Sequence, residues 1–267
     1  MINRENFGEA SLAARLRRGE YVTGVFITEF ETPNWGPLLD AVNYDFGIID
    51  LEHGLFTLSS LARMLPGFHG CRSSALIRVP STERSFFQAP LDLGAAGIIL
   101  PMVESAEEAR RAVALMKYPP LGRRGIGFGR PHTDFLTNPD RDDYIAHANA
   151  STLLIVQIET AAGVEQAEEI LAVPGIDVVF IGNADLSQSL GCRNDFRAEP
   201  LKSAVAKIFQ AAARNKLIVG GNLTDAGLVR DFAPHNFRFI TLTTDVDMIE
   251  DGFNGKWTPE LKAAMLR

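Results

Sequence analysis

Cysteine is scarce in this 267-residue chain, which contains only Cys71 and Cys192. Two cysteines so far apart do not make a disulfide framework, and neither has a companion at metal-ligand spacing. Residues 1–6 also lack the basic and then apolar pattern of a signal peptide. We therefore expect a reducing, cytoplasmic compartment for this protein.

Long apolar runs and basic clusters are missing as well. The longest apolar run, residues 94–103, is about half of the ~20 residues that a membrane-spanning helix needs. The formal net charge is −7, and the arginines at 123, 124 and 130 are too few for a stripe that binds a polyanion. We therefore expect neither a membrane nor a nucleic acid as a partner. A hydrophobic content of 46% and a charged content of 22% are typical of a folded globular protein.

Eight short apolar runs recur along the chain. They cover residues 22–27, 46–50, 75–79, 97–101, 153–159, 178–182, 217–221 and 237–242. Each is nearly continuous in aliphatic residues and phenylalanine, which is typical of parallel strands buried on both faces. Helical segments are predicted between them. One begins at Ser105, because a serine followed by Glu108 three residues later forms a capping box. The others cover 163–171, 201–214, 224–232 and the chain from 247 onward.

This alternation predicts an α/β fold of the (β/α)8, or TIM, barrel type, which typically takes ~250 residues. The alternative is a doubly wound open sheet, which usually has a glycine-rich phosphate turn after its first strand; residues 27–30 do not form one. We expect a single domain over residues 1–267 with a short N-terminal helix at 12–18. The glycine- and proline-rich connection between residues 116 and 152 is predicted to be a long functional loop.

Ionisable residues end several of these strands, and in a barrel all those ends meet at one mouth. Glu159 and Asp185 follow neighbouring strands. Two carboxylates, completed by water and substrate oxygens, are ligands that Mg²⁺ prefers. Separately, Asp185 could cap a helix and Glu159 could pair with an arginine. Their occurrence together on adjacent strands favours a metal site.

The second and third strands also end in ionisable residues. Asp50 and His53 are predicted to meet across a turn, which would make His53 a general acid or base; the alternative is a structural hydrogen bond. Arg78 suits the capture of a carboxylate or phosphate, and it could also pair with Glu52 or Asp50. Only six lysines occur, and none ends a predicted strand. An aldolase that works through a lysine Schiff base is therefore disfavoured.

Several longer motifs occur in a fixed order. They are IDLEH at 49–53, GIILPMVESAEEA at 97–109, YPP at 118–120, RGIG at 124–127, QIET at 157–160, FIG at 180–182 and DLS at 185–187. On these motifs the chain resembles the HpcH/HpaI aldolases, which are metal-dependent class II pyruvate aldolases with a barrel of the phosphoenolpyruvate/pyruvate superfamily type. The resemblance implies a carbon–carbon lyase that cleaves or forms 4-hydroxy-2-oxo acids, such as 2-keto-3-deoxy acids, to or from pyruvate and an aldehyde.

The resemblance also implies roles for residues. It places Mg²⁺, Mn²⁺ or Co²⁺ on Glu159 and Asp185, with no organic cofactor, and the pyruvate oxygens on Arg78. It makes Asp50 and His53 act with a metal-bound water in proton transfer. The remaining residues implied are Asp92, which would act in a neighbouring subunit's site, and Gln157, Gly182, Asn183 and Ala184, which would bind substrate. A homo-oligomer built as a trimer-based hexamer is implied as well.

The chain departs from the family pattern in two places. It has Asn183 where members commonly have proline, and residues 128–132 differ from the usual loop. The acceptor aldehyde is therefore left open. The alternatives are a citryl- or malyl-CoA-type lyase, a phosphoenolpyruvate phosphotransferase or mutase, and a non-catalytic binding barrel. The ends of the seventh and eighth strands supply no cation for a phosphate, so the phosphotransferase or mutase alternative is disfavoured.

Overall fold

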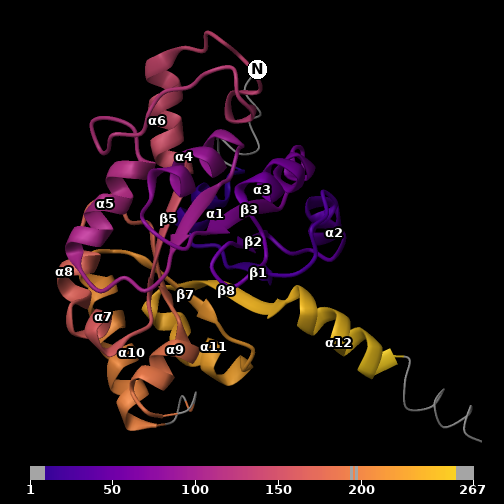
Figure 1. Ribbon diagram of the computed structural model, residues 1–267. Helices are drawn as coiled ribbons and strands as arrows, with labels where there is room; N and C mark the ends of the chain where they lie inside the picture. Colours follow the sequence, from indigo (N-terminus) through magenta and orange to yellow (C-terminus); the bar gives the residue numbers. More distant parts are fainter. Residues whose placement is uncertain (1–9, 193–194, 196–197, 257–267) are drawn as a thin grey trace, which may run out of the picture.

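The computed structural model describes residues 10–192, 195 and 198–256. Eight strands close into a barrel in which every neighbouring pair is parallel and β1 pairs with β8 (Figure 1). The strands are β1 Val22–Ile27, β2 Phe46–Asp50, β3 Ser74–Arg78, β4 Gly97–Leu100, β5 Leu153–Ile158, β6 Val178–Ile181, β7 Ile218–Asn222 and β8 Phe237–Thr244. This arrangement confirms the predicted (β/α)8 barrel.

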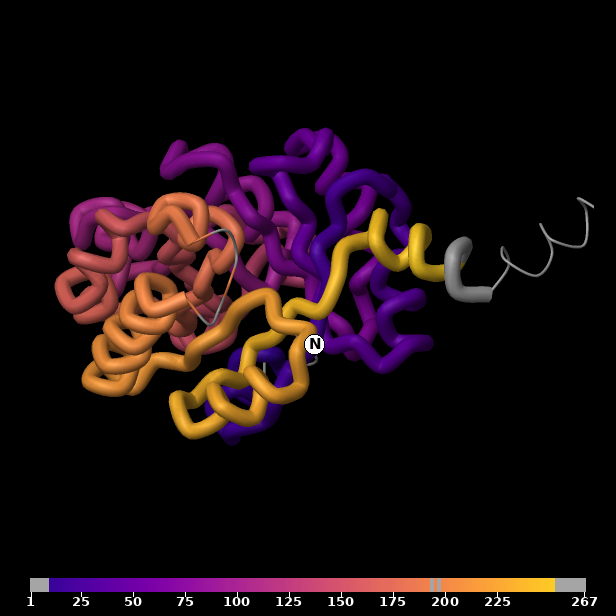
Figure 2. The backbone as a smooth tube through the Cα atoms, turned by 90° about the horizontal axis from the view of Figure 1, so that it is seen from below, coloured from indigo at the N-terminus to yellow at the C-terminus, as the bar shows by residue number. Residues whose placement is uncertain are grey.

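Helices alternate with the strands, and most of them cover the outside of the barrel (Figures 1 and 2). They are α1 Leu12–Arg17, α2 Trp35–Ala41, α3 Leu58–Met64, α4 Arg84–Asp92, α5 Ala106–Met116, α6 Arg141–Ser151, α7 Ala161–Glu165, α8 Ala167–Leu171, α9 Asn183–Ser189, α10 Glu199–Arg214, α11 Ala226–Phe232 and α12 Asp245–Lys256. Three short 3₁₀ turns, η1 Leu65–Phe68, η2 Pro131–Thr133 and η3 Ala233–His235, lie among them. The predicted capping box at the start of α5 is present, with Ser105 and Glu108 bonding each other's backbone.

The barrel interior is a packed apolar core. Side chains from the strands fill it, and the rings of Phe46 and Phe239 stack with their centroids 4.2 Å apart. The predicted N-terminal helix is α1, whose Leu12 and Leu16 join this interior cluster. A second apolar cluster lies between the barrel wall and the outer helices. These two layers fix the strand ends and thereby the positions of the polar side chains that follow them.

One expectation about the outer layer was wrong. The connection between residues 116 and 152 is not a loop throughout, because α6 occupies its second half. Only Tyr144 and Ala148 of this helix are buried, so its apolar stripe is too narrow to be visible as a helical pattern in the sequence.

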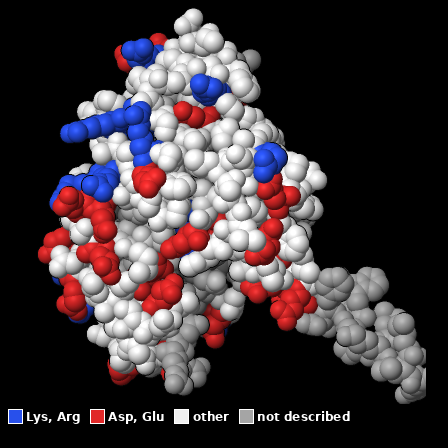
Figure 3. Space-filling model, in the orientation of Figure 1, with Lys and Arg blue, Asp and Glu red and all other residues white. Residues whose placement is uncertain are grey.

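The last helix, α12, differs from the others in its position. After β8, α12 extends away from the barrel, as both Figure 1 and Figure 2 show. None of the helices described here is long and apolar enough to cross a membrane. On the face shown in Figure 3, Lys and Arg side chains lie in separate clusters and acidic side chains are scattered mainly over the lower half.

Candidate active site

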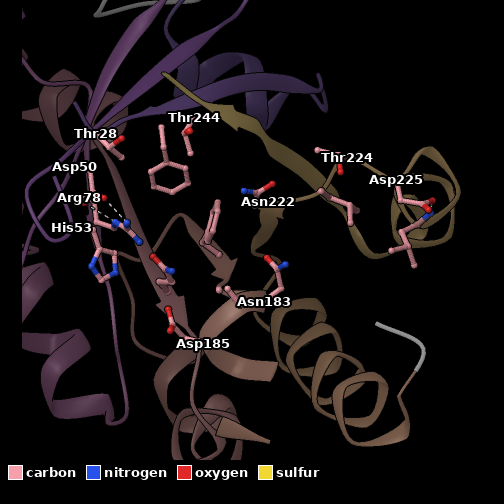
Figure 4. A pocket seen from close by; sticks show the side chains of 17 residues that line it. Thr28, Asp50, His53, Arg78, Asn183, Asp185, Asn222, Thr224, Asp225 and Thr244 are labelled. Atoms are coloured by element: carbon pink, nitrogen blue, oxygen red, sulfur yellow. Dashed lines mark hydrogen bonds and ion pairs between the residues drawn. The ribbon is translucent and has the colours of Figure 1, made fainter. Parts of the chain in front are cut away.

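A cavity of about 700 Å³ opens at the carboxyl ends of the strands (Figure 4). Eight of the ten predicted site residues line it: Asp50, His53, Arg78, Gln157, Gly182, Asn183, Ala184 and Asp185. Glu159 lies directly behind Gly182, where a Cβ on that glycine would stand 2.3 Å from Glu159 Oε2. The barrel thus gathers residues that are far apart in sequence at one mouth.

The arginine of the cavity is held by a neighbouring strand. Asp50 and Arg78 are partners in the register of β2 with β3, so their side chains lie side by side. Arg78 donates from Nε to Asp50 Oδ1 at 2.9 Å and from a terminal nitrogen to Oδ2 at 2.5 Å (Figure 4). Burial opposes the charge of Arg78, but its bonds to Asp50 outweigh this effect and raise its pKa. The guanidinium is therefore a fixed cation in the lining of the cavity.

The predicted contact between Asp50 and His53 is wrong. Both carboxylate oxygens of Asp50 accept from Arg78, and Oδ1 also accepts from the Glu52 backbone N–H at 3.0 Å. His53 Nε2 instead lies 3.9 Å from Glu52 Oε2, and its side chain is 64% exposed. The register of two paired strands fixes Asp50 on Arg78, whereas His53 stands three residues further along a loop at the rim of the cavity.

Glu159 is the most perturbed carboxylate of the site. It is buried, and its oxygens accept from the Met102 backbone N–H at 2.7 Å and from Gln157 Nε2 at 2.5 Å. Burial raises the pKa of Glu159 to about 7 against the Met102 hydrogen bond, and the nearby charges of Glu52 and Asp185 raise it further. A cation bound beside it would stabilise its ionised form.

The carboxylates of Glu159 and Asp185 fit a divalent cation that takes its other ligands from water and substrate. Glu159, Asp185 and Glu52 repel one another electrostatically, and burial also raises the pKa of Glu52. Within the described residues, no three His, Cys, Asp or Glu side chains are grouped as a complete metal centre. Hard carboxylate oxygens in such a partial set suit Mg²⁺ or Mn²⁺.

Asp92 is separate from this cavity within the chain. It ends α4, where it accepts from Arg124 at 3.0 Å and from Gln88 Nε2 at 2.7 Å. It is not among the residues that line the cavity.

Several site residues were missed by the sequence analysis. Thr28, Asn222, Thr224, Asp225 and Thr244 line the side of the cavity formed by β7, β8 and β1. Their positions at or just after strand ends could have revealed them, but the amide of Asn222 and the hydroxyls of the three threonines carry little chemical signal in a sequence.

Asp245 was also missed. Its buried carboxylate accepts from the backbone N–H groups of Thr28, Glu29 and Phe30 at 2.9–3.0 Å and from the Thr28 hydroxyl at 2.7 Å. These bonds lower its pKa against the effect of burial. One carboxylate after β8 thus fixes the loop after β1.

Known proteins resemble the chain over most of its length. A hydroxypyruvate/pyruvate aldolase from Roseovarius nubinhibens is 35% identical over 238 residues, which cover 88% of this chain and 90% of that protein. A 2-keto-3-deoxy-L-rhamnonate aldolase from Salmonella gallinarum is 37% identical over 176 residues, which cover 66% of this chain and 65% of that protein. These relatives are carbon–carbon lyases by name, which confirms the predicted class of enzyme.

Solved structures of HpcH/HpaI aldolases have the same fold as this chain. A crystal structure of an HpcH/HpaI aldolase from Desulfitobacterium hafniense superposes with a TM-score of 0.86 at 29% identity, covering 91% of this chain and 94% of that one. The family model for HpcH/HpaI aldolase/citrate lyase matches residues 37–251, which hold every predicted site residue. The chain therefore belongs to the HpcH/HpaI aldolase/citrate lyase family.

Proposed function

We propose that this protein is a divalent-metal-dependent aldolase that cleaves or forms 4-hydroxy-2-oxo acids to or from pyruvate and an aldehyde. The observation that carries the proposal is the grouping of a fixed cation, Arg78, with the carboxylates Glu159 and Asp185 at one strand-end cavity. A phosphotransferase would need further cations for a phosphate, and the described residues that β7 and β8 bring to the cavity include none.

The side chains around the 2-oxo acid have separate tasks. Arg78 uses two donors on Asp50, which leaves other guanidinium N–H groups for the carboxylate and the enolate oxygen of the substrate. Gln157 is oriented by its bond to Glu159, and its Oε1 is buried without a hydrogen-bond partner among the described residues. That oxygen would accept a hydrogen bond from a hydroxyl of the ligand or from a water. Glu159 and Asp185 would hold the divalent cation, which, when bound, supplies Lewis-acid polarisation of the 2-oxo group.

Cleavage requires the C4 hydroxyl to lose a proton. His53 at the rim, near the Glu52 carboxylate, is the proposed acceptor. The C3–C4 bond then breaks, the C4 carbon leaves as the aldehyde, and the electron pair stays with the carbons that become pyruvate. A proton added at C3 completes pyruvate. Asp50 contributes through Arg78, because it holds the guanidinium in place.

The test is pyruvate release from a panel of 4-hydroxy-2-oxo acids, with and without chelator. We expect chelator to abolish release and Mg²⁺, Mn²⁺ or Co²⁺ to restore it, whereas full activity in excess chelator would contradict the metal role. His53→Ala should lower the cleavage rate by about 10²–10⁴-fold while metal still binds. Glu159→Ala should lose metal binding, and unchanged metal affinity in that variant would refute the ligand assignment. Cleavage of citryl- or malyl-CoA in place of these acids would favour the CoA-lyase alternative.

Other parts of the proposal rest on the family resemblance. Asp92 is proposed to act in a neighbouring subunit's site, within a trimer-based homohexamer. A single domain over residues 1–267, a cytoplasmic location and the absence of an organic cofactor stay predictions.

A further inference from the structure

Met102 lies two residues after β4 and has a left-handed backbone, with a φ of 53°. This conformation is disfavoured for any residue that has a Cβ, and it persists only where the surrounding structure holds it. The other described non-glycine residues with positive φ lie elsewhere in the fold: Asn43, Lys216 and Asn236 come before strands, and Asp134 and Phe135 follow η2. Met102 is therefore the position that brings such strain to the carboxyl end of the barrel.

The backbone of Met102, and not its side chain, faces the site. Met102 is 48% exposed, whereas its neighbours Pro101 and Val103 are buried. Packing of the Met102 side chain within the described chain therefore does not account for the left-handed backbone. Its backbone N–H points inward and donates to Glu159 Oε1 at 2.7 Å. The strained conformation thus directs a main-chain donor at the proposed metal ligand.

The residues that follow Met102 hold this loop against the end of β5. The Val103 N–H donates to the Gln157 carbonyl at 3.2 Å. The Thr160 hydroxyl donates to a carboxylate oxygen of Glu104 at 2.7 Å. Because these two bonds lie on either side of residue 159 along the chain, they fix the loop where the Met102 N–H reaches the Glu159 carboxylate.

Glu159 is held at both of its carboxylate oxygens. Oε1 accepts from the Met102 N–H, and Oε2 accepts from Gln157 Nε2 at 2.5 Å. Each carboxylate oxygen has two lone pairs, so each keeps one for a cation. The amide of Gln157 can rotate about its side-chain bonds, whereas the main-chain N–H of Met102 moves only with its loop. The loss of a donor that orients a metal ligand typically lowers metal affinity by about 10–100-fold.

We propose that Met102 is a positioning residue for the divalent cation: its left-handed backbone, and not its side chain, holds Glu159 in the orientation that binds metal. The inference rests on the proposed metal-dependent function and adds a residue outside the cavity lining that controls metal affinity. Residues that accept a left-handed backbone should therefore replace Met102 without loss, whatever their size or polarity. A β-branched residue resists this conformation and should not replace it.

The experiment measures Mn²⁺ affinity by calorimetric titration in four variants at position 102. Met102→Gly and Met102→Asn tolerate positive φ, and Met102→Ala removes the side chain beyond Cβ, so all three should stay within about threefold of the native affinity. Met102→Val should bind Mn²⁺ about tenfold or more weakly. A side chain that acted by its own contacts would instead be lost equally in all four.

The matched control is Lys216→Val. Lys216 is exposed and has a φ of 55°, but it lies before β7, at the opposite end of the barrel from the cavity. Lys216→Val should lower the temperature of thermal unfolding about as much as Met102→Val does, because both force a β-branched residue into a left-handed backbone. It should keep the native Mn²⁺ affinity, which separates positioning of the ligand from general destabilisation.

Hydrogen–deuterium exchange gives a second measurement, which decides the matter even if Met102→Val does not fold. In metal-free Glu159→Ala, the Met102 amide should exchange at least about tenfold faster than in the metal-free native enzyme, because its acceptor is gone. The Val103 amide is the internal control, since its acceptor is the Gln157 carbonyl and its exchange rate should not change. Mass spectrometry with electron-transfer fragmentation resolves the two amides.

Three results would overturn the inference: native Mn²⁺ affinity in Met102→Val, equal losses in Met102→Gly and Met102→Val, or an unchanged exchange rate of the Met102 amide in Glu159→Ala. If the native enzyme binds Mn²⁺ and releases pyruvate, these results refute only the role of Met102. A native enzyme that neither binds Mn²⁺ nor releases pyruvate would refute the proposed function and this inference with it.

Discussion

Gly182 connects the end of β6 to the site, and replacing it with alanine should damage catalysis more than folding. Its φ of −80° and ψ of 76° do not require glycine, so the backbone accepts alanine without left-handed strain. The space around the Gly182 α-carbon is what excludes a larger residue. A Cβ there would stand 2.3 Å from Glu159 Oε2, 2.6 Å from Glu159 Cβ and 2.7 Å from Gln157 Nε2.

The size of the displacement follows from these distances. Carbon atoms in contact lie about 3.5–4.0 Å apart, and carbon–oxygen contacts are rarely below about 3.3 Å. The carboxylate must therefore move by about 1 Å. A new rotamer of Glu159 does not relieve the clash, because its Cβ is itself too close and is fixed to the end of β5. A displacement of about 1 Å at a catalytic group costs on the order of 10²-fold in rate.

We therefore expect Gly182→Ala to lower kcat/KM for pyruvate release about 10²-fold and to weaken Mn²⁺ binding by about 10–100-fold, measured by calorimetric titration. The matched control is Gly252→Ala in α12, where no atom lies within 4 Å of the added Cβ. Thermal unfolding of both variants separates a local effect from a folding defect. Native Mn²⁺ affinity and native activity in Gly182→Ala would refute the assignment of Glu159 and Gln157 to one tightly packed cradle.

Two further predictions concern buried carboxylates. Because burial raises the pKa of Glu159 from 4.5 to about 7, the metal-free folded state holds this proton more tightly than the unfolded state. Its ionisation should therefore destabilise the fold as pH rises from 4.5 to 7, by roughly 3 kcal/mol relative to Glu159→Gln in denaturant titrations. Metal affinity should rise with pH up to about 7, and a flat profile would contradict this. Asp245→Asn removes charged acceptors from three backbone N–H groups. It should cost about 2–4 kcal/mol of unfolding free energy and raise KM for the substrate, because Thr28 lines the cavity, whereas Asp251→Asn on the exposed side of α12 should change neither.

The sequence was sufficient for the barrel, and it pointed to most of the polar residues that line the cavity at the ends of β2, β3, β5 and β6. Buried parallel strands are nearly continuous aliphatic runs, so all eight were visible, and ionisable residues at their ends stand out against such runs. The sequence was insufficient where a contact depends on register. Asp50 and His53 are close in the chain, but Asp50 faces Arg78 across the β2–β3 pair. Nothing local in the sequence distinguishes these two partners.

The side of the cavity formed by β7, β8 and β1 depends on how the barrel closes. β8 pairs with β1, and Asp245, directly after β8, holds the backbone of Thr28 and the two residues that follow it. Thr28 and Thr244 therefore line this side of the cavity as one connected unit, while Asn222 lies at the end of β7. A substitution at Asp245 should disturb this side of the cavity and leave the Arg78–Asp50 pair in place. The two sides of the cavity are thus held by different contacts, so a substitution can change one side without displacing Arg78 on the other.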